Sequence, residues 1–239
     1  APLSSIQWVV LAYLIAATVA IVLAGRLGDM FGHRQVLLSG LMLFAIASVA
    51  CATAPTLGVL IAARAAQGVG GAILMALPMS IARDAVKEEQ LGAAMGLLGT
   101  MSAVGTALGP SLGGVLVAAL GWRAVFLPLA GFAVLVLGLV LLAISPPAAR
   151  VGKVGASLDW PGAALLAFSL TAYSLATAGG RAGVAGTASL YLLIAVIGLA
   201  LFVRIETRTS APLVSVAMLR KREISASLAM NGIASTAMM

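Results

Sequence analysis

Long apolar stretches recur along this chain, and short connections between them hold most of the charged residues. Residues 1–24 and residues 35–63 contain no charged side chain and flank a decapeptide, Gly25–Arg34, that is rich in glycine and charge. A helix of about 20 apolar residues is long enough to cross the hydrocarbon core of a bilayer. Because 62% of the residues are hydrophobic and 9% are charged, against about 25% charged in a soluble domain, the chain is predicted to be an integral membrane protein.

Glycine and proline inside the apolar stretches favour helices over the alternating pattern of barrel strands, so the predicted fold class is an all-α membrane bundle. The predicted spans cover residues 8–24, 36–52, 57–81, 91–120, 124–144, 160–178 and about 182–203, and an eighth begins near residue 224. Residue 1 is not a methionine and no basic leader follows it, while the last residues are apolar. We therefore expect a fragment of a longer protein.

The charges predict the orientation in the membrane and exclude some partners. Eleven of the fourteen basic residues fall on one set of alternate connections, which the positive-inside rule assigns to the cytoplasm together with Gly25–Arg34. The net charge of +7 is scattered between apolar runs, a pattern that argues against nucleic-acid binding. A single cysteine, Cys51, leaves no disulfide framework and no cysteine-based metal site, and we expect neither a metal nor a cofactor.

Arg64 is the one basic residue predicted inside a span. It lies nine residues after Pro55, so at 1.5 Å per residue it is about 13 Å into the third span, near the middle of the bilayer. An intramembrane arginine indicates a functional site, because an unpaired charge there is costly; a side chain that snorkels to the interface is the alternative. Gln67, one turn later, is expected to share a face with Arg64.

Two further glycine-rich segments have a physical interpretation. In the predicted fourth span, Gly105, Gly109 and Gly113 form a smooth helix face, and Pro110 removes a backbone hydrogen bond, so a kinked and closely packed helix is expected. Packing without any role in transport is the alternative for this face. In the decapeptide, glycines allow close backbone approach and Asp29 is placed to cap a helix N-terminus elsewhere; a solvated loop is the alternative, and His33 is expected to be solvated.

Three motifs resemble those of the major facilitator superfamily: G-x-L-x-D-x-x-G-x-R at residues 25–34, R-x-x-Q-G-x-G at 64–70, and G-x-x-x-G-P-x-x-G-G at 105–114. W-R-x-x-F at 122–126 resembles the start of the sixth span in that family and is expected to be structural. The resemblance implies roles that we list by group. They are cytoplasmic gating for Gly25, Arg26, Gly28, Asp29, Gly32 and Arg34; proton coupling for Arg64 and Gln67; an antiporter helix motif of Gly105, Gly109, Pro110, Gly113 and Gly114; and a substrate cavity of Tyr13, Gln67 and Met101, for which ordinary packing is the alternative.

Two segments resemble the fourteen-span drug/proton antiporter branch: D-W-P-G at 159–162 and E-T-R-x-x-A-P-L at 206–213. The resemblance implies an N-terminal-half fragment in five parts. These are an N-terminal bundle without its first span (1–144), a cytoplasmic linker (145–158), two extra membrane helices (159–205), a second linker (206–223) and the start of the C-terminal bundle (224–239).

The implied function is export of drugs or other amphipathic small molecules in exchange for protons by alternating access, in a monomer of the bacterial cytoplasmic membrane with substrate, protons and lipid as its partners. A proton-linked metabolite exporter, an uptake permease or a non-transporting scaffold is the alternative. All seven acidic residues fall in predicted cytoplasmic loops, so the titrating acid is expected outside this chain. With no intramembrane carboxylate and a single histidine, an intramembrane hydrolase is not expected, and we predict that the chain is not an enzyme.

Overall fold

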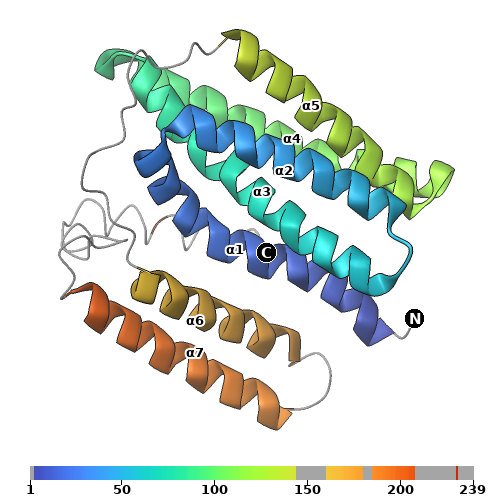
Figure 1. Ribbon diagram of the computed structural model, residues 1–239, viewed down its shortest axis with the longest axis vertical. Helices are drawn as coiled ribbons and strands as arrows, with labels where there is room; N and C mark the ends of the chain where they lie inside the picture. Colours follow the sequence, from blue (N-terminus) through green and yellow to red (C-terminus); the bar gives the residue numbers. More distant parts are fainter. Residues whose placement is uncertain (1–2, 144–159, 180–184, 208–229, 231–239) are drawn as a thin grey trace.

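The computed structural model of the protein describes residues 3–143, 160–179, 185–207 and 230 (Figure 1). Helices follow one another through these ranges: α1 (Leu3–Phe31), α2 (His33–Thr53), α3 (Leu57–Ala85), α4 (Leu91–Leu120), α5 (Phe126–Ala143), α6 (Trp160–Gly179) and α7 (Ala185–Glu206). Short 3-10 turns, η1 (Glu88–Gln90) and η2 (Trp122–Val125), precede α4 and α5. The Thr56 hydroxyl begins α3 by accepting a hydrogen bond from the Val59 amide at 3.3 Å.

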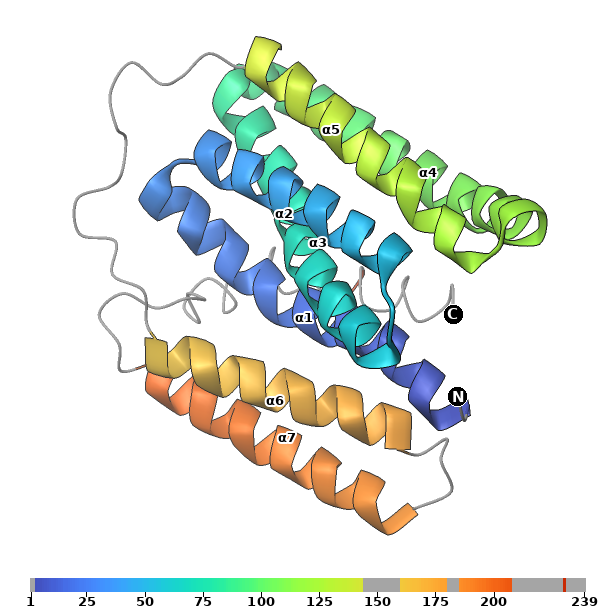
Figure 2. The same ribbon diagram turned by 45° about the vertical axis from the view of Figure 1, so that its right-hand side comes forward.

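Helix α3 is the central element of the bundle. It packs against both α1 and α2, while α2 also packs against α5. Helices α6 and α7 form a separate pair that contacts α1, so this pair and α5 lie on opposite sides of α1–α3 (Figures 1 and 2). The main apolar core joins α1, α2, α3 and α5, and its most buried members include Ala24, Leu41 and Leu77.

Six helices in the described ranges are long and apolar enough to span a membrane: α1, α2, α3, α4, α5 and α7. In α6 the apolar segment is shorter, Gly162–Ala176. The prediction of an all-α membrane fold is therefore confirmed. Apart from residues 206, 207 and 230, the predicted eighth span and the predicted linkers at 145–158 and 206–223 lie outside the described residues.

The predicted ten-residue loop at Gly25–Arg34 is wrong in extent. Helix α1 continues through this segment to Phe31, and α2 begins at His33. Gly32 alone makes the turn: its φ of 91° lies in the region that favours glycine, and its amide donates to the Gly28 carbonyl at 2.8 Å. One residue of this kind is enough to end a helix, so the chain needs no longer loop.

Three acidic residues are helical instead of lying in loops, and the prediction is wrong for these. Asp29, Asp84 and Glu206 each belong to the last turn of a helix, α1, α3 and α7 respectively. Glu206 is only 2% exposed. The reason is that these helices run past the apolar residues on which their predicted ends were based.

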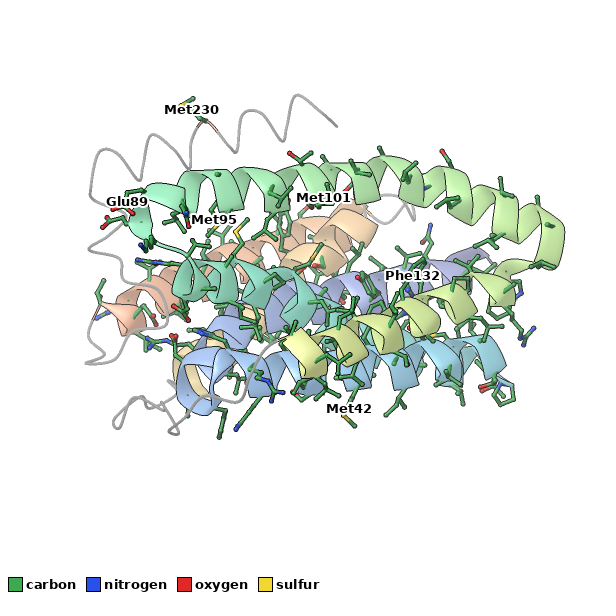
Figure 3. All side chains as sticks on the ribbon, turned by 90° about the horizontal axis from the view of Figure 1, so that it is seen from above. Met42, Glu89, Met95, Met101, Phe132 and Met230 are labelled. Carbon is green, nitrogen blue, oxygen red and sulfur yellow. The ribbon has the colours of Figure 1, made fainter. Side chains whose placement is uncertain are left out.

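The close packing expected around the glycines of α4 is not made within the described part of the chain. No residue of α4 is buried, and a Cβ placed on Gly105, Gly109 or Gly113 meets no atom within 4 Å. Helix α4 continues through Pro110 and lies along one edge of the bundle (Figure 3). The glycine face of α4 is therefore open in the described structure.

Helix α4 allows a test of the orientation. Lys87 precedes its first turn and Leu120 ends it, and both side chains are exposed; the helix is about 45 Å long, which separates them by the thickness of a bilayer. In a Cys51→Ala background in intact cells, we expect a membrane-impermeant thiol reagent to label Leu120→Cys and not Lys87→Cys. Labelling of Lys87→Cys alone would show that the orientation is the opposite of the predicted one.

Candidate functional site

Arg64 lies on α3 with its side chain partly buried. It comes seven residues after Leu57, the first residue of α3, and so is about 10 Å along the helix. The central residue of α3 is Gly71, because the helix runs on to Ala85. Arg64 is therefore nearer the first end of α3 than the sequence predicts.

Neutral hydrogen-bond partners hold the Arg64 guanidinium. Its Nε donates to the backbone carbonyl of Val9 on α1 at 3.3 Å, and its Nη1 donates to Gln67 Oε1 at 2.6 Å. The Gln67 amide donates in turn to the Ser48 hydroxyl on α2 at 2.8 Å, and Ser48 donates to the Phe44 carbonyl at 2.7 Å. Gln67 and Ser48 are both fully buried, so this chain of hydrogen bonds crosses the interior from α1 to α2.

Aromatic rings cover the same guanidinium. Arg64 Cζ lies 4.4 Å from the centroid of the Tyr13 ring and 5.8 Å from that of Phe126. Both distances are within the range of a cation–π attraction, which is stronger where water is excluded. Tyr13 belongs to α1 and Phe126 begins α5, so Arg64 contacts side chains from two other helices. We call Arg64, Gln67, Ser48, Tyr13 and Phe126 the Arg64 cluster.

A second cation lies beside the Arg64 cluster. Arg123 stacks on Trp122, with its Cζ 4.4 Å from the ring centroid, and its Nη2 donates to the Ala54 carbonyl at 2.9 Å. Trp122 meets Phe126 edge to face at 6.4 Å between ring centroids. The W-R-x-x-F segment, residues 122–126, was predicted to be structural. It connects η2 to the C-terminal end of α2 and also places Phe126 at Arg64.

No carboxylate of the described residues pairs with Arg64. The ion pairs of these ranges join His33 to Asp29 and to Asp84, at the other end of α3. A guanidinium has five N–H donors, and the described hydrogen bonds of Arg64 use two of them. The arrangement therefore leaves donors of a fixed cation available for an anionic group.

Glycines of the arginine motif explain how α1 and α2 approach so closely. A Cβ on Gly68 would clash with the Tyr13 backbone carbonyl, and a Cβ on Gly70 would lie 2.8 Å from the Phe44 amide nitrogen. Gly68 is one turn after Arg64 and shares its face of α3. The absence of a side chain at Gly68 thus lets α1 bring the Val9 carbonyl and the Tyr13 ring to the arginine.

The predicted site residues are brought together in part. Tyr13 and Gln67 both contact Arg64, but Gln67 is fully buried and occupied by hydrogen bonds instead of facing a cavity. Met101 is 56% exposed on α4 and joins no described contact of the Arg64 cluster (Figure 3). The sequence analysis missed Ser48, the Val9 carbonyl and the contact of Phe126. A hydroxyl in the apolar stretch 36–52 was a usable signal for Ser48, whereas a backbone carbonyl has no sequence signal.

The predicted gating residues lie at the junction of α1 and α2. Asp29 Oδ1 is 3.5 Å from His33 Nε2, so within the described structure Asp29 pairs with histidine instead of capping a helix N-terminus. His33 also contacts Asp84, and its side chain is 23% exposed, so the expectation of a solvated histidine is wrong. Gly28 packs against the His33 ring, while a Cβ on Gly25 would meet nothing within 4 Å. Arg26 and Arg34 are partly buried on the same two helix ends.

Comparisons with known proteins give both a family match and individual relatives. Residues 1–239 match the family model described as Major Facilitator Superfamily. The chain is 35% identical over 218 residues to the uncharacterized MFS-type transporter YvkA of Bacillus subtilis, covering 91% of this chain and 48% of that protein. It is 34% identical to the tetracenomycin C resistance and export protein of Streptomyces glaucescens (95% and 42% covered) and 33% identical to the multidrug resistance protein Stp of Mycobacterium tuberculosis (90% and 40%). The chain thus spans less than half the length of these relatives.

The close approach of α1 and α3 at Gly68 can be tested with a matched control. Gly68→Ala places a methyl group against the α1 backbone, and such overpacking typically costs about 1–3 kcal/mol. Gly58→Ala lies on the same helix with open space around it, so it should be neutral or stabilising by about 0.5–1 kcal/mol. Thermal unfolding of the purified protein in detergent should show a lower midpoint for Gly68→Ala alone. Equal midpoints for the two variants would mean that α1 and α3 do not cross closely here.

Proposed function

This chain belongs to the Major Facilitator Superfamily, and from that membership we propose that it is part of an exporter that exchanges amphipathic small molecules for protons. The family consists of transporters, not enzymes, and the chain is a multi-pass protein of the cell membrane. The relatives named for multidrug resistance and for resistance to and export of tetracenomycin C support outward transport of drug-like compounds. Because the chain spans less than half of these proteins, the activity is proposed for the complete transporter.

The observation that carries the proposal is the Arg64 cluster. An arginine inside a bundle of membrane helices has a high energetic cost, so its presence there indicates a function. Within the described residues its partners are neutral, which keeps the cation in place without neutralising it. A carboxylate contributed from outside these residues would bind the remaining N–H donors when ionised and release them when protonated. Arg64 would in this way link the binding of a proton to a change in helix contacts.

The proposed link between proton binding and helix contacts is important for alternating access. In this mechanism two bundles rock about a site near the middle of the membrane. The Arg64 cluster joins α1, α2, α3 and α5, so a change in the charge opposite Arg64 acts on several helices at once. The residues at the Gly32 turn lie at the other end of α1 and are proposed to stabilise one state of the cytoplasmic face.

The segment Gly105–Gly114 of α4 resembles the antiporter helix motif of the superfamily, and this resemblance favours an exporter over an uptake permease. Its glycine face is open within the described residues and continues across Pro110. We propose that a helix from the remainder of the transporter packs on it through the small residues Gly105, Gly109, Gly113 and Gly114. Helices α6 and α7 are proposed to be the two additional spans of a fourteen-span transporter.

Arg64→Ala should abolish proton-driven efflux while the protein still inserts into the membrane, because removing the charge also removes a cost of insertion. Arg64→Lys should recover only part of the activity, since an ammonium lacks the planar N–H pattern of a guanidinium. Efflux would be measured in energised inverted vesicles at matched abundance, with Arg204→Ala, an exposed arginine in the last turn of α7, as the control. Normal proton-driven efflux by Arg64→Ala would reduce Arg64 to a packing role.

Gly109→Leu should lower efflux more than abundance, because a large side chain would block the proposed packing on α4. Pro110→Ala should also lower efflux, because it restores the backbone hydrogen bond that proline lacks and so removes a point at which α4 can bend. Gly96→Leu is the matched control: Gly96 has the same open surroundings but lies on the opposite face of α4. If Gly109→Leu and Gly96→Leu transport equally well in the same vesicles, the packing face has no part in transport.

A further inference from the structure

Three helix ends meet at His33, the first residue of α2. Its Nδ1 lies 3.0 Å from Asp84 Oδ2 in the last turn of α3, and its Nε2 lies 3.5 Å from Asp29 Oδ1 in the last turn of α1. Both ring nitrogens therefore face a carboxylate, each from a different helix. Asp29 precedes His33 by four residues, whereas Asp84 is 51 residues away, so the contact joins the junction of α1 and α2 to the end of α3.

The protonation state of the imidazole decides whether both contacts are attractive. A neutral histidine has one N–H donor, whereas a protonated histidine has two. With a neutral ring, one of the two carboxylates faces a nitrogen lone pair. With a protonated ring, both carboxylates accept charge-assisted hydrogen bonds. Histidine is also the side chain whose charge ordinarily changes between about pH 5 and 8.

The surroundings hold the ring in place but leave it accessible to protons. The ring packs against Gly28, where a Cβ would lie only 2.5 Å from His33 Cδ2, and Gly28 is itself covered by the Leu77 side chain of α3. The His33 side chain is 23% exposed, and those of Asp29 and Asp84 are 47% and 64% exposed. Water and protons therefore reach the group without any opening of the bundle.

The other basic residues of these helix ends are arginines, whose charge is permanent. Arg26 on α1, Arg34 on α2 and Arg83 on α3 keep their charge throughout the range in which histidine changes its own. His33 is therefore the residue of these helix ends whose type ordinarily changes charge between about pH 5 and 8.

We propose that Asp29, His33 and Asp84 form a proton-operated tie, in which one proton bound to His33 fastens the ends of α1, α2 and α3 together. The tie is fastened below the pH range in which histidine changes charge, and it loosens above that range. Its assignment to the cytoplasmic face rests on the proposed orientation of the exporter. At the cytoplasmic face, the tie makes the rigidity of the junction between α1 and α2 at Gly32 depend on cytoplasmic pH. This dependence is separate from the coupling proposed for Arg64.

The test measures distances between spin labels at Phe31→Cys and Ala85→Cys, the last residues of α1 and α3, in the complete transporter with Cys51→Ala. With His33 present, the distance distribution should be narrow at about pH 5 and broad at about pH 8. His33→Arg should be narrow at both values, because its charge is permanent. His33→Gln and Asp84→Asn should lose the response to pH.

A control separates this proposal from the proposed function. Arg64→Ala, which removes the proposed coupling, should keep the full response of the label distances to pH, since Arg64 lies far along α3 from Asp84. An unchanged distribution between the two pH values with His33 present would overturn the tie. An equal response in His33→Gln would overturn it as well, because another group would then be the one that binds the proton.

Discussion

The close crossing of α1 and α3 at Gly68 is the constraint on which the rest of the site depends. Only a residue without a side chain fits beside the Tyr13 carbonyl, and this fit places Val9 and Tyr13 against Arg64. A buried cation is otherwise costly, because it loses water without gaining a counter-charge. Backbone and side-chain dipoles and two aromatic rings offset that cost here. The charge is thereby retained inside the bundle at a defined position.

Helix α3 connects this cluster with the opposite end of the bundle. It carries Arg64 near its first end and Asp84 in its last turn, and it packs on both α1 and α2 along its length. The two charged sites are therefore placed on one continuous element, with the apolar core of Leu41 and Leu77 between them. Each end is held by its own contacts, Arg64 by Val9 and Gln67 and Asp84 by His33. The two ends are therefore separate sites on one transporter bundle.

Much of the fold could be predicted from sequence because span positions depend on the length of apolar runs, which is a local property. The α4 bounds, Leu91–Leu120, match the predicted span 91–120, and Arg64 and Gln67 contact one another as their spacing indicates. The turn at Gly32 was missed because polar residues continue a helix as readily as they form a loop. Ser48 was missed, and His33 was wrongly expected to be solvated, for another reason: they have partners on other helices, so their roles depend on tertiary packing.

Neutral hydrogen bonds that run from Arg64 through Gln67 to Ser48 hold the arginine in place. A double-mutant cycle on thermal unfolding in bilayers, with Ser48→Ala, Gln67→Met and the double variant, measures the coupling between Gln67 and Ser48 on which this arrangement depends. Side-chain hydrogen bonds between membrane helices typically contribute about 0.6 kcal/mol and at most about 1.7 kcal/mol, and we expect a coupling energy in that range. Additive effects, with no coupling between the two substitutions, would contradict the account.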